Sequence, residues 1–334
     1  MKKFWFILIP IIFSGLFSFG QDIHFSQYFA SPLTLNPAMT GGFNGDFRVG
    51  ANYRKQWFVT SAYSTFSAFG DVPLMRKKLN GDQMGAGIYF YNDNAGQGAL
   101  TTNNVMASYA YHKVLDRFNK HRLSLGVAVG FLQKRVDINK LTFESQFNGD
   151  DGFNNVPSGE AFDNTTVFNP DINAGIVWNS RFSDQVNAYV GFSFSHIARP
   201  KENFLAGSDN RLSQKYTLHG SIDFKIGQYL HFIPGFMYIT QNTAQEITAG
   251  TAFGYEVNEN SSFYLGGWYR VQDAFVAYLG YEIYNMRIGF SYDATTSTWK
   301  EANNGNGAVE VSIVYIHQNE PPHKFSPVRY CPAF

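Results

Sequence analysis

The chain reads Leu123-Ser124-Leu125-Gly126-Val127-Ala128-Val129-Gly130-Phe131, in which large apolar residues alternate with serine, glycine and alanine. Side chains of a β-strand point alternately to opposite faces, so this segment has one aliphatic or aromatic face and one small or polar face. About fourteen segments between Asp46 and His317 share the alternation. A closed barrel in lipid pairs every backbone group and exposes only its outer face to hydrocarbon. The pattern therefore predicts an all-β fold, a transmembrane antiparallel β-barrel of about fourteen strands.

The composition agrees with a barrel and argues against nucleic-acid binding. Without Lys2 and Lys3, which precede an apolar run, 24 basic residues face 26 acidic ones, a net charge of −2. No basic excess points to nucleic acid. Aromatic residues make up 17% of the chain and charged residues 16%, where soluble chains have about 25% charged residues. Cys331 is the only cysteine in the sequence, which excludes an internal disulfide and a cysteine metal cluster.

Residues 1–20 have the features of a cleavable export signal. Two lysines precede an apolar run from Phe4 to Phe19, and Ser18-Phe19-Gly20 places small residues before Gln21. A membrane anchor is the alternative, but the run is short and contains Pro10. We expect a segment at 21–45 in the periplasm or the lumen, the outer-membrane barrel at 46–317, and a periplasmic C-terminal tail at 318–334.

The connections between the predicted strands separate by parity. The strands are expected near Asp46–Trp57, Tyr63–Val72, Met84–Asn92, Thr102–His112, Leu123–Gln133, Asp171–Asn179, Val186–His196, Tyr216–Lys225, Leu230–Thr240, Glu246–Tyr255, Phe263–Arg270, Ala274–Ile283, Met286–Tyr292 and Ala308–His317. Connections after even-numbered strands are short, whereas Arg135–Pro170, Ile197–Lys215 and Ala294–Gly307 follow odd-numbered ones. Outer-membrane barrels have short periplasmic turns and long external loops. This parity places both ends of the mature chain in the periplasm. Pro234 requires a bulge or a position at the rim.

The alternation also fits a soluble two-sheet sandwich, which would bury the apolar face. A barrel instead turns Phe47, Val49 and Tyr53 to lipid and keeps Arg48 and Arg54 in a wet lumen. The even strand number, the parity and aromatic residues near strand ends favour the barrel. The expected interfacial aromatic residues are Trp57, Tyr91, Tyr111, Trp178, Trp268, Tyr269, Tyr281, Tyr292 and Tyr315.

One hairpin has a defined register. A two-residue turn at Tyr284-Asn285 places Glu282 opposite Arg287 on the lumen side and Tyr281 opposite Ile288 on the lipid side. Opposite charges across strands contribute about 0.2–1 kcal/mol. We favour a solvated ion pair that sets the register over a functional gate.

Glycines recur on the predicted lumen face. They are Gly50, Gly85, Gly87, Gly126, Gly130, Gly175, Gly191, Gly250, Gly254, Gly266, Gly280 and Gly289. Side chains cannot fill a barrel this wide, and glycine permits the close approach of a plug or a bound polypeptide. Glycine also eases sheet curvature, and both explanations stay open.

The segment before the barrel is too apolar for a solvated tail. Phe25, Tyr28 and Phe29 are its aromatic residues, and Asn36 and Pro37 lie near its end. Proline precludes a long helix or a central strand here. We expect these five residues to contact a partner or a plug. The segment that carries them should pack into or under the barrel.

The chain resembles the PorP/SprF family of type IX secretion outer-membrane proteins. The matching pieces are Gln21-Asp22…His24-Phe25-Ser26-Gln27, Leu35-Asn36-Pro37-Ala38…Thr40-Gly41, Tyr53-Arg54…Gln56-Trp57, Leu123-Ser124-Leu125-Gly126, Lys140-Leu141-Thr142-Phe143, Arg199-Pro200, Tyr216-Thr217-Leu218-His219-Gly220, Leu265-Gly266…Trp268-Tyr269-Arg270…Asp273-Ala274-Phe275 and Cys331-Pro332. Their order and spacing carry the resemblance. Ile23 and Ala333 depart from the usual pattern, with no consequence for the fold.

The resemblance implies a non-enzymatic outer-membrane component of a Gram-negative, Bacteroidota-like cell. Its expected partners are lipid, other type IX secretion components, and a large adhesin-like secreted protein bound through the adhesin's C-terminal domain at the cell surface. One branch of the family serves the core machine and the other a particular adhesin, with a link to gliding motility. A passive solute porin and a barrel enzyme are the alternatives.

The sequence suggests no catalytic, cofactor or metal site. Its eight histidines are scattered, and neither a nucleophile elbow nor a phosphate-binding loop is present. His112 and His219 fall on the lumen face as hydrogen-bonded residues. Residues 148–155 contain oxygen ligands but do not match an EF-hand, so we expect ordinary turns there rather than calcium binding.

Overall fold

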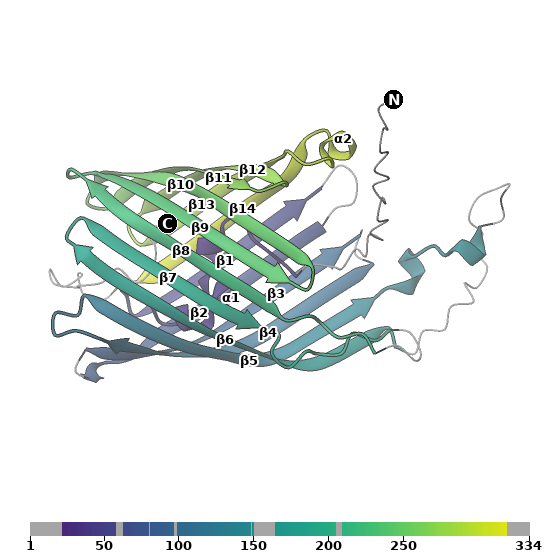
Figure 1. Ribbon diagram of the computed structural model, residues 1–334, viewed down its shortest axis with the longest axis horizontal. Coiled ribbons are helices and arrows are strands. Elements are labelled where there is room, and N and C mark those ends of the chain that lie inside the picture. The colour runs from purple at the N-terminus through teal and green to yellow at the C-terminus, as the bar shows by residue number, and fades with distance from the viewer. Residues whose placement is uncertain are drawn as a thin grey trace, which may run out of the picture.

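The computed structural model describes residues 22–57, 63–79, 81–96, 99–147, 149, 164–204 and 209–318. Fourteen antiparallel strands form a closed barrel in which β1 pairs with β14 (Figure 1), which confirms the predicted fold. The export signal, most of residues 148–155 and Cys331 lie outside the described residues. In the described part, no helix has both the length and the apolar character needed to cross a membrane.

The strands follow the chain in order around the barrel. They are β1 Phe47–Gln56, β2 Tyr63–Leu79, β3 Asp82–Ala95, β4 Leu100–Val114, β5 His121–Val136, β6 Thr166–Ser183, β7 Val186–Ser195, β8 Lys215–Ile226, β9 Leu230–Gln241, β10 Ala244–Asn258, β11 Ser261–Arg270, β12 Ala274–Ile283, β13 Met286–Thr295 and β14 Asn306–His317. Strands β2 to β6 exceed the predicted lengths, because their polar ends continue the ladder beyond the apolar alternation. Pro234 lies within β9. Two residue pairs between β8 and β9 are missing beside it, but the pairs before and after this gap have the same register, so the predicted bulge is wrong.

The predicted faces are confirmed. Leu125, Val127 and Leu279 are 54%, 50% and 58% exposed on the outer face. The long connections at 137–165, 196–214 and 296–305 all follow odd-numbered strands, and the last contains helix α2, Lys300–Asn303. We call this end of the barrel the loop side and the opposite end the turn side.

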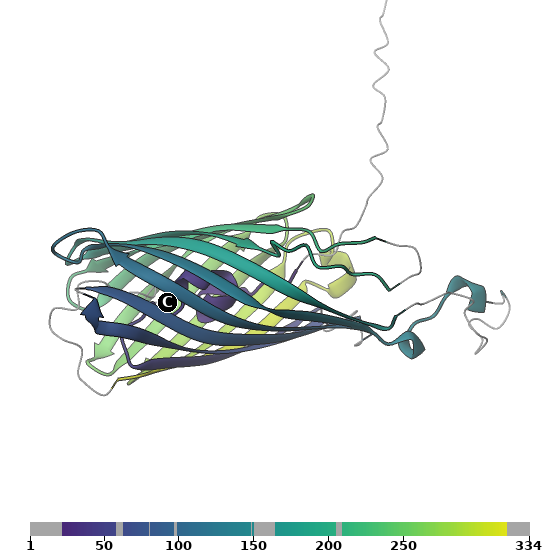
Figure 2. The same ribbon diagram turned by 90° about the horizontal axis from the view of Figure 1, so that it is seen from below.

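Residues 22–45 form a plug that runs through the lumen (Figure 2). The plug contains the short helices η1 Tyr28–Ala30, α1 Pro32–Leu35 and η2 Pro37–Met39. The Asp22 N–H donates to Gln241 Oε1 at the loop side, 2.9 Å away. The Asp46 N–H donates to the His317 carbonyl at the turn side, 2.7 Å away. The described part of the segment therefore lies in the lumen, one of the two predicted places, and it begins on the loop side rather than on the turn side, where the parity argument placed the start of the mature chain.

The core of the protein lies inside the barrel, where plug and lumen side chains pack together. Arg48 and Arg54 are 1% and 2% exposed, so the predicted wet surroundings of these two arginines are wrong: each donates a hydrogen bond to the plug. Tyr91 and Trp268, predicted at the membrane interface, are buried on the lumen face instead. Positions near strand ends alternate between the two faces like all other strand positions, so these two side chains point into the lumen. There Trp268 contacts Phe29 and Tyr91 contacts Asp22.

Candidate functional site

The plug joins both strands of the seam at which the barrel closes. The Ser26 N–H donates to Glu310 on β14 over 2.8 Å, and the Gln27 N–H donates to the same carboxylate over 3.0 Å. Arg54 of β1 pairs with that Glu310 carboxylate over 3.2 Å. The Ser26 hydroxyl donates to Asp293 of β13 over 2.8 Å. Buried charges are stable only when paired and hydrogen-bonded, so the plug backbone completes this network.

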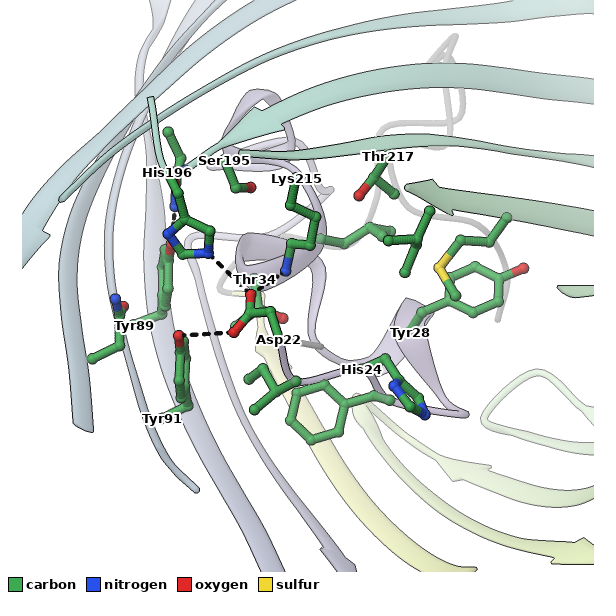
Figure 3. A pocket seen from close by; sticks show the side chains of 17 residues that line it. Asp22, His24, Tyr28, Thr34, Tyr89, Tyr91, Ser195, His196, Lys215 and Thr217 are labelled. Atoms are coloured by element: carbon green, nitrogen blue, oxygen red, sulfur yellow. Dashed lines mark hydrogen bonds and ion pairs between the residues drawn. The ribbon is translucent and has the colours of Figure 1, made fainter. Parts of the chain in front are cut away.

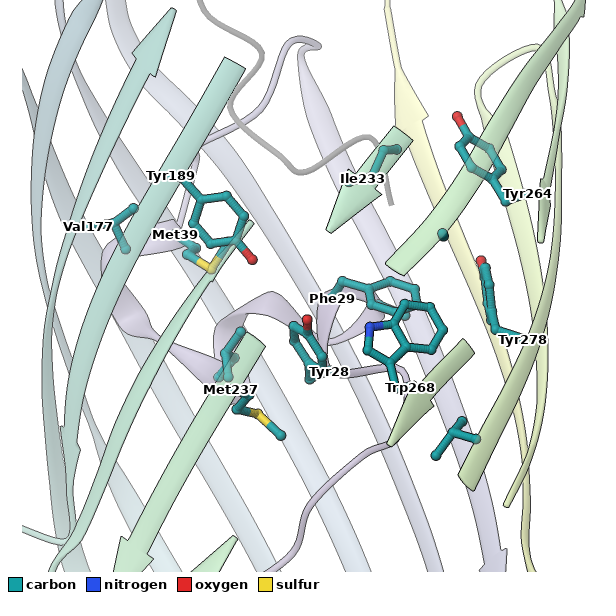
Figure 4. Close-up of a cluster of buried hydrophobic side chains, with 14 of the residues drawn as sticks. Tyr28, Phe29, Met39, Val177, Tyr189, Ile233, Met237, Tyr264, Trp268 and Tyr278 are labelled. Atoms are coloured by element: carbon teal, nitrogen blue, oxygen red, sulfur yellow. The ribbon is translucent and has the colours of Figure 1, made fainter. Parts of the chain in front are cut away.

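Aromatic residues hold the next part of the plug. The Phe29 ring lies 5.6 Å from the Trp268 ring and 5.2 Å from the Tyr278 ring, measured between centroids (Figure 4). The Tyr28 and Phe25 side chains are 6% and 5% exposed. Burial of a large apolar side chain contributes roughly 1.5–3 kcal/mol. Tyr28 and Phe29 thus belong to one buried cluster in the lumen, and Phe25 is buried as well.

Asn36 anchors the following turn to the opposite wall. Its amide nitrogen lies 3.2 Å from the Ile176 carbonyl and 3.1 Å from the Phe192 carbonyl. The same nitrogen lies 3.1 Å from Nε2 of His219, and the Asn36 Oδ1 accepts the Ala38 N–H over 2.9 Å. Because a β-bonded backbone has few free carbonyls, one asparagine that satisfies two of them specifies the position of the plug.

The last part of the plug binds β2 to β4 near the turn side. The Gly41 N–H donates to Asp71 over 2.7 Å, and Arg48 donates to the same carboxylate over 2.8 Å. Nε2 of His112 lies 2.8 Å from the Thr40 carbonyl. The lumen positions predicted for His112 and His219 are confirmed, with hydrogen bonds to the plug at both.

The lumen glycines make room for the plug at some positions and for rings of the barrel at others. A Cβ at Gly85, Gly126, Gly175 or Gly289 would overlap the plug, so these glycines permit its close approach. At Gly50, Gly191, Gly254, Gly266 and Gly280 the space is occupied instead by a ring of the barrel, which covers the glycine.

A charged cluster holds the loop-side end of the plug at Asp22. Lys215 pairs with the Asp22 carboxylate, and the Nε2 atom of His196 lies 3.1 Å from it (Figure 3). The Nδ1 atom of His196 lies 2.7 Å from Asp171. Burial tends to lower the pKa of His196, but its bonds to Asp171 and Asp22 raise it to about 9. Burial tends to raise the pKa of Asp22, but Lys215 and His196 hold it well below its usual value.

The Glu282–Arg287 pair lies at the turn side, in the predicted register. The Arg287 Nε donates to Glu282 over 2.9 Å, and the guanidinium lies 4.7 Å from the Tyr264 ring centroid. The two side chains are 30% and 21% exposed. The pair borders a cavity under the plug that Phe29 and Tyr278 also line.

The sequence did not single out Ser26, Gln27, Asp22, His196 or Lys215 as site residues. The first three occur in the quoted N-terminal piece, which was the available signal. Their partners lie up to 285 positions away in the chain, so no local pattern links them.

The family model for the type IX secretion system membrane protein PorP/SprF matches residues 17–315. The chain belongs to this family. Together with the barrel, family membership places the protein in the outer membrane as a type IX secretion component. Curated protein sequences include no match to it.

Solved structures with a similar fold include two aromatic-hydrocarbon proteins. The toluene transporter TbuX of Ralstonia pickettii has a TM-score of 0.52 at 12% identity, over 86% of this chain and 92% of that one. The monoaromatic hydrocarbon channel TodX, as a deltaS2S3 mutant, has a TM-score of 0.52 at 10% identity, over 85% of this chain and 93% of that one. At these identities the likeness shows the fold alone.

Proposed function

We propose that this PorP/SprF protein binds a large adhesin-like secreted protein through the adhesin's C-terminal domain and helps to export it or anchor it at the cell surface. The setting is a Bacteroidota cell, with a role in gliding motility. The protein is not an enzyme in this proposal and works with other type IX components. The observation that carries the proposal is the plug. It occupies the lumen of this PorP/SprF family member, and the long connections all lie on the loop side.

The plug also weighs against the solute porin. Its polar anchors reach β1, β2, β4, β6, β13 and β14 from inside, so expelling it would break many buried hydrogen bonds at once. We expect the purified protein to give no large steady current in a planar bilayer. Such a current through the intact chain would favour the porin.

A pull-down from membranes tests the proposed capture. We expect a tagged chain to recover one large secreted protein, and deletion of the gene to leave that protein unexported or degraded. Recovery of the barrel by itself, from cells that make the adhesin, would refute the proposal.

A locked plug separates capture at the loops from capture in the lumen. The Ser31 and Ser67 hydroxyl oxygens, of the plug and β2, lie 3.3 Å apart. Ser31→Cys with Ser67→Cys, in a Cys331→Ser background, would tie the plug to the wall. We expect the oxidised protein to retain the partner as well as the reduced one, because binding occurs on the loop side. Loss of the partner on oxidation would indicate that it enters the lumen.

A further inference from the structure

The outer face of β3, β4 and β5 becomes polar toward the loop side. On β5 the outward residues are apolar up to Phe131, and Gln133 and Arg135 are the next two outward positions. On β4 and β3 the same change occurs at Asn103 and Asn92. In the register of the sheet, Asn92 pairs with Asn103 and Asn103 pairs with Gln133. The change therefore falls in one row across three strands.

This row begins where the hydrocarbon layer ends. A tilted transmembrane strand needs about 9–11 residues, and the apolar part of β5, Leu123–Phe131, has nine. Amide and guanidinium groups are costly in hydrocarbon, so Gln133 and Arg135 lie outside it. The long connections of outer-membrane barrels face the outside of the cell. The row therefore lies beside the headgroups of the outer leaflet.

Hydrogen bonds join the polar side chains of this face. The Thr101 hydroxyl donates to Asn94 over 3.0 Å, and the Asn94 amide donates to Asn92 over 2.6 Å. The Asn92 amide donates to Asn103 over 2.7 Å, and the Asn103 amide donates to Gln133 over 3.1 Å. We call these five residues the amide row. Within the described residues, each asparagine uses one N–H and one oxygen lone pair here and keeps one of each, which is what a sugar hydroxyl can bind.

Arg135 adds a positive charge to the amide row. In the register of the sheet it lies between Thr101 of β4 and Thr166 of β6. Its side chain is exposed, and the ion pairs of the described residues do not include it. The rings of Phe131 and Phe168 stack on the same face, with centroids 5.0 Å apart. A guanidinium beside hydroxyl and amide groups suits a phosphate, which it binds through paired charge-assisted hydrogen bonds.

We propose that the amide row and Arg135 bind the phosphorylated sugar headgroup of an outer-leaflet lipopolysaccharide. The amide row continues the apolar face that the same strands present to lipid, so the lipid of that leaflet is always beside it. Lipopolysaccharide fills the outer leaflet of Gram-negative outer membranes, and its headgroup carries both phosphate and sugar hydroxyls. The phosphate complements Arg135, the hydroxyls complement the amides, and the Phe131–Phe168 pair contacts the adjoining acyl chains. The inference depends on the outer-membrane location and is independent of adhesin capture.

Binding of purified lipopolysaccharide to the full chain in detergent, measured by native mass spectrometry, tests the proposal. We expect Arg135→Gln to weaken binding about tenfold, because it removes charge-assisted bonds. Asn103→Ala interrupts the amide row and should weaken binding about fivefold. Lys55→Gln is the matched control: it removes an exposed positive charge from the loop-side end of β1, away from the row, and should change binding by less than about twofold. Heat-modified gel mobility checks that each barrel is folded.

A second probe separates the glycolipid from anionic lipid in general. Phosphatidylglycerol carries a phosphate without a sugar ring, and we expect it to bind at least about tenfold more weakly than lipopolysaccharide. Equal binding of the two lipids would overturn the proposal. Equal lipopolysaccharide binding by wild type and Arg135→Gln, or an equal loss in Lys55→Gln, would overturn it as well.

A photo-crosslinker at position 168, which is in register with Gln133, gives a reading in the membrane of the cell. We expect adducts with lipopolysaccharide from this position. Position 263 is the control, because Phe263 is exposed on the outer face near the turn side and faces the inner leaflet. It should give no such adduct. An adduct with a protein at position 168, in place of lipopolysaccharide, would show a different occupant and overturn the inference.

Discussion

The two walls of the barrel hold the plug in opposite ways. On the β3 to β6 wall, Gly85 and Gly126 remove side chains so that the plug backbone lies directly against the sheet, and Gly175 makes room for the Asn36 side chain. On the β11 and β12 wall, Trp268 and Tyr278 project into the lumen and enclose Phe29. The first wall accommodates the plug because it lacks side chains there, and the second wall holds the plug with large aromatic rings.

This difference shows that one residue type serves two purposes in the same barrel. Glycine on the first wall makes room for another segment, whereas Gly280 of β12 and Gly254 of the adjacent strand β10 make room for rings of the barrel itself. A backbone neighbour cannot move aside, but a ring can rotate. The walls should therefore respond differently to the same substitution.

Removal of the central plug ring should have the largest effect. We expect Phe29→Ala to lower the free energy of unfolding by about 4 kcal/mol, because it leaves a cavity between Trp268 and Tyr278. Urea unfolding in lipid vesicles, followed by tryptophan fluorescence, measures it. Phe263→Ala is the control, since Phe263 is 56% exposed on the outer face. Equal losses in the two variants would show that Phe29 is not part of a packed core.

A methyl group on the glycine wall should cost slightly less. In Gly126→Ala the new Cβ meets the backbone of Pro37 and Ala38, and we expect a loss of about 3 kcal/mol in the same assay. In Gly254→Ala the nearest atom is on the Tyr264 ring, 2.8 Å away, and the ring can shift. There we expect about 1 kcal/mol. A larger loss at Gly254 than at Gly126 would contradict the proposed difference between the walls.

Alkaline pH should loosen the outer end of the plug, where charge rather than shape provides the contact. His196 has its pKa raised to about 9, so its contribution is complete below about 6.5 and is lost as pH rises through 9. The Asp22 contribution is lost only as pH falls below about 4. We expect unfolding to be easier at pH 9.5 than at pH 6, by on the order of 2 kcal/mol. His196→Gln should remove most of this pH difference; an unchanged difference would assign it to other groups.

The turn-side ion pair should matter least. Glu282→Gln should lower the stability by about 0.5 kcal/mol, because both partners of the pair are partly exposed. Raising the salt concentration should reduce the wild-type advantage. A loss above about 2 kcal/mol would indicate a coupled network, and a new steady conductance in the variant would support a gate.

Much of the barrel could be predicted because its signals are local. The alternation in Leu123–Phe131 marks the outer face, and the two-residue turn at Tyr284-Asn285 sets the Glu282–Arg287 register. The plug could be predicted as a packed segment from Phe25, Tyr28 and Phe29. Its route could not, since the two proline-bounded turns do not show at which end of the barrel the segment enters.

Strand number, face and the parity of the loops follow from the sequence, since a period of two residues and short turns are properties of neighbouring residues. Only the folded barrel decides that Ser26 meets Asp293, 267 positions later, and that Asp22 lies at the loop side. These contacts arise from closure of the sheet around a segment, and closure brings together residues that no local pattern relates.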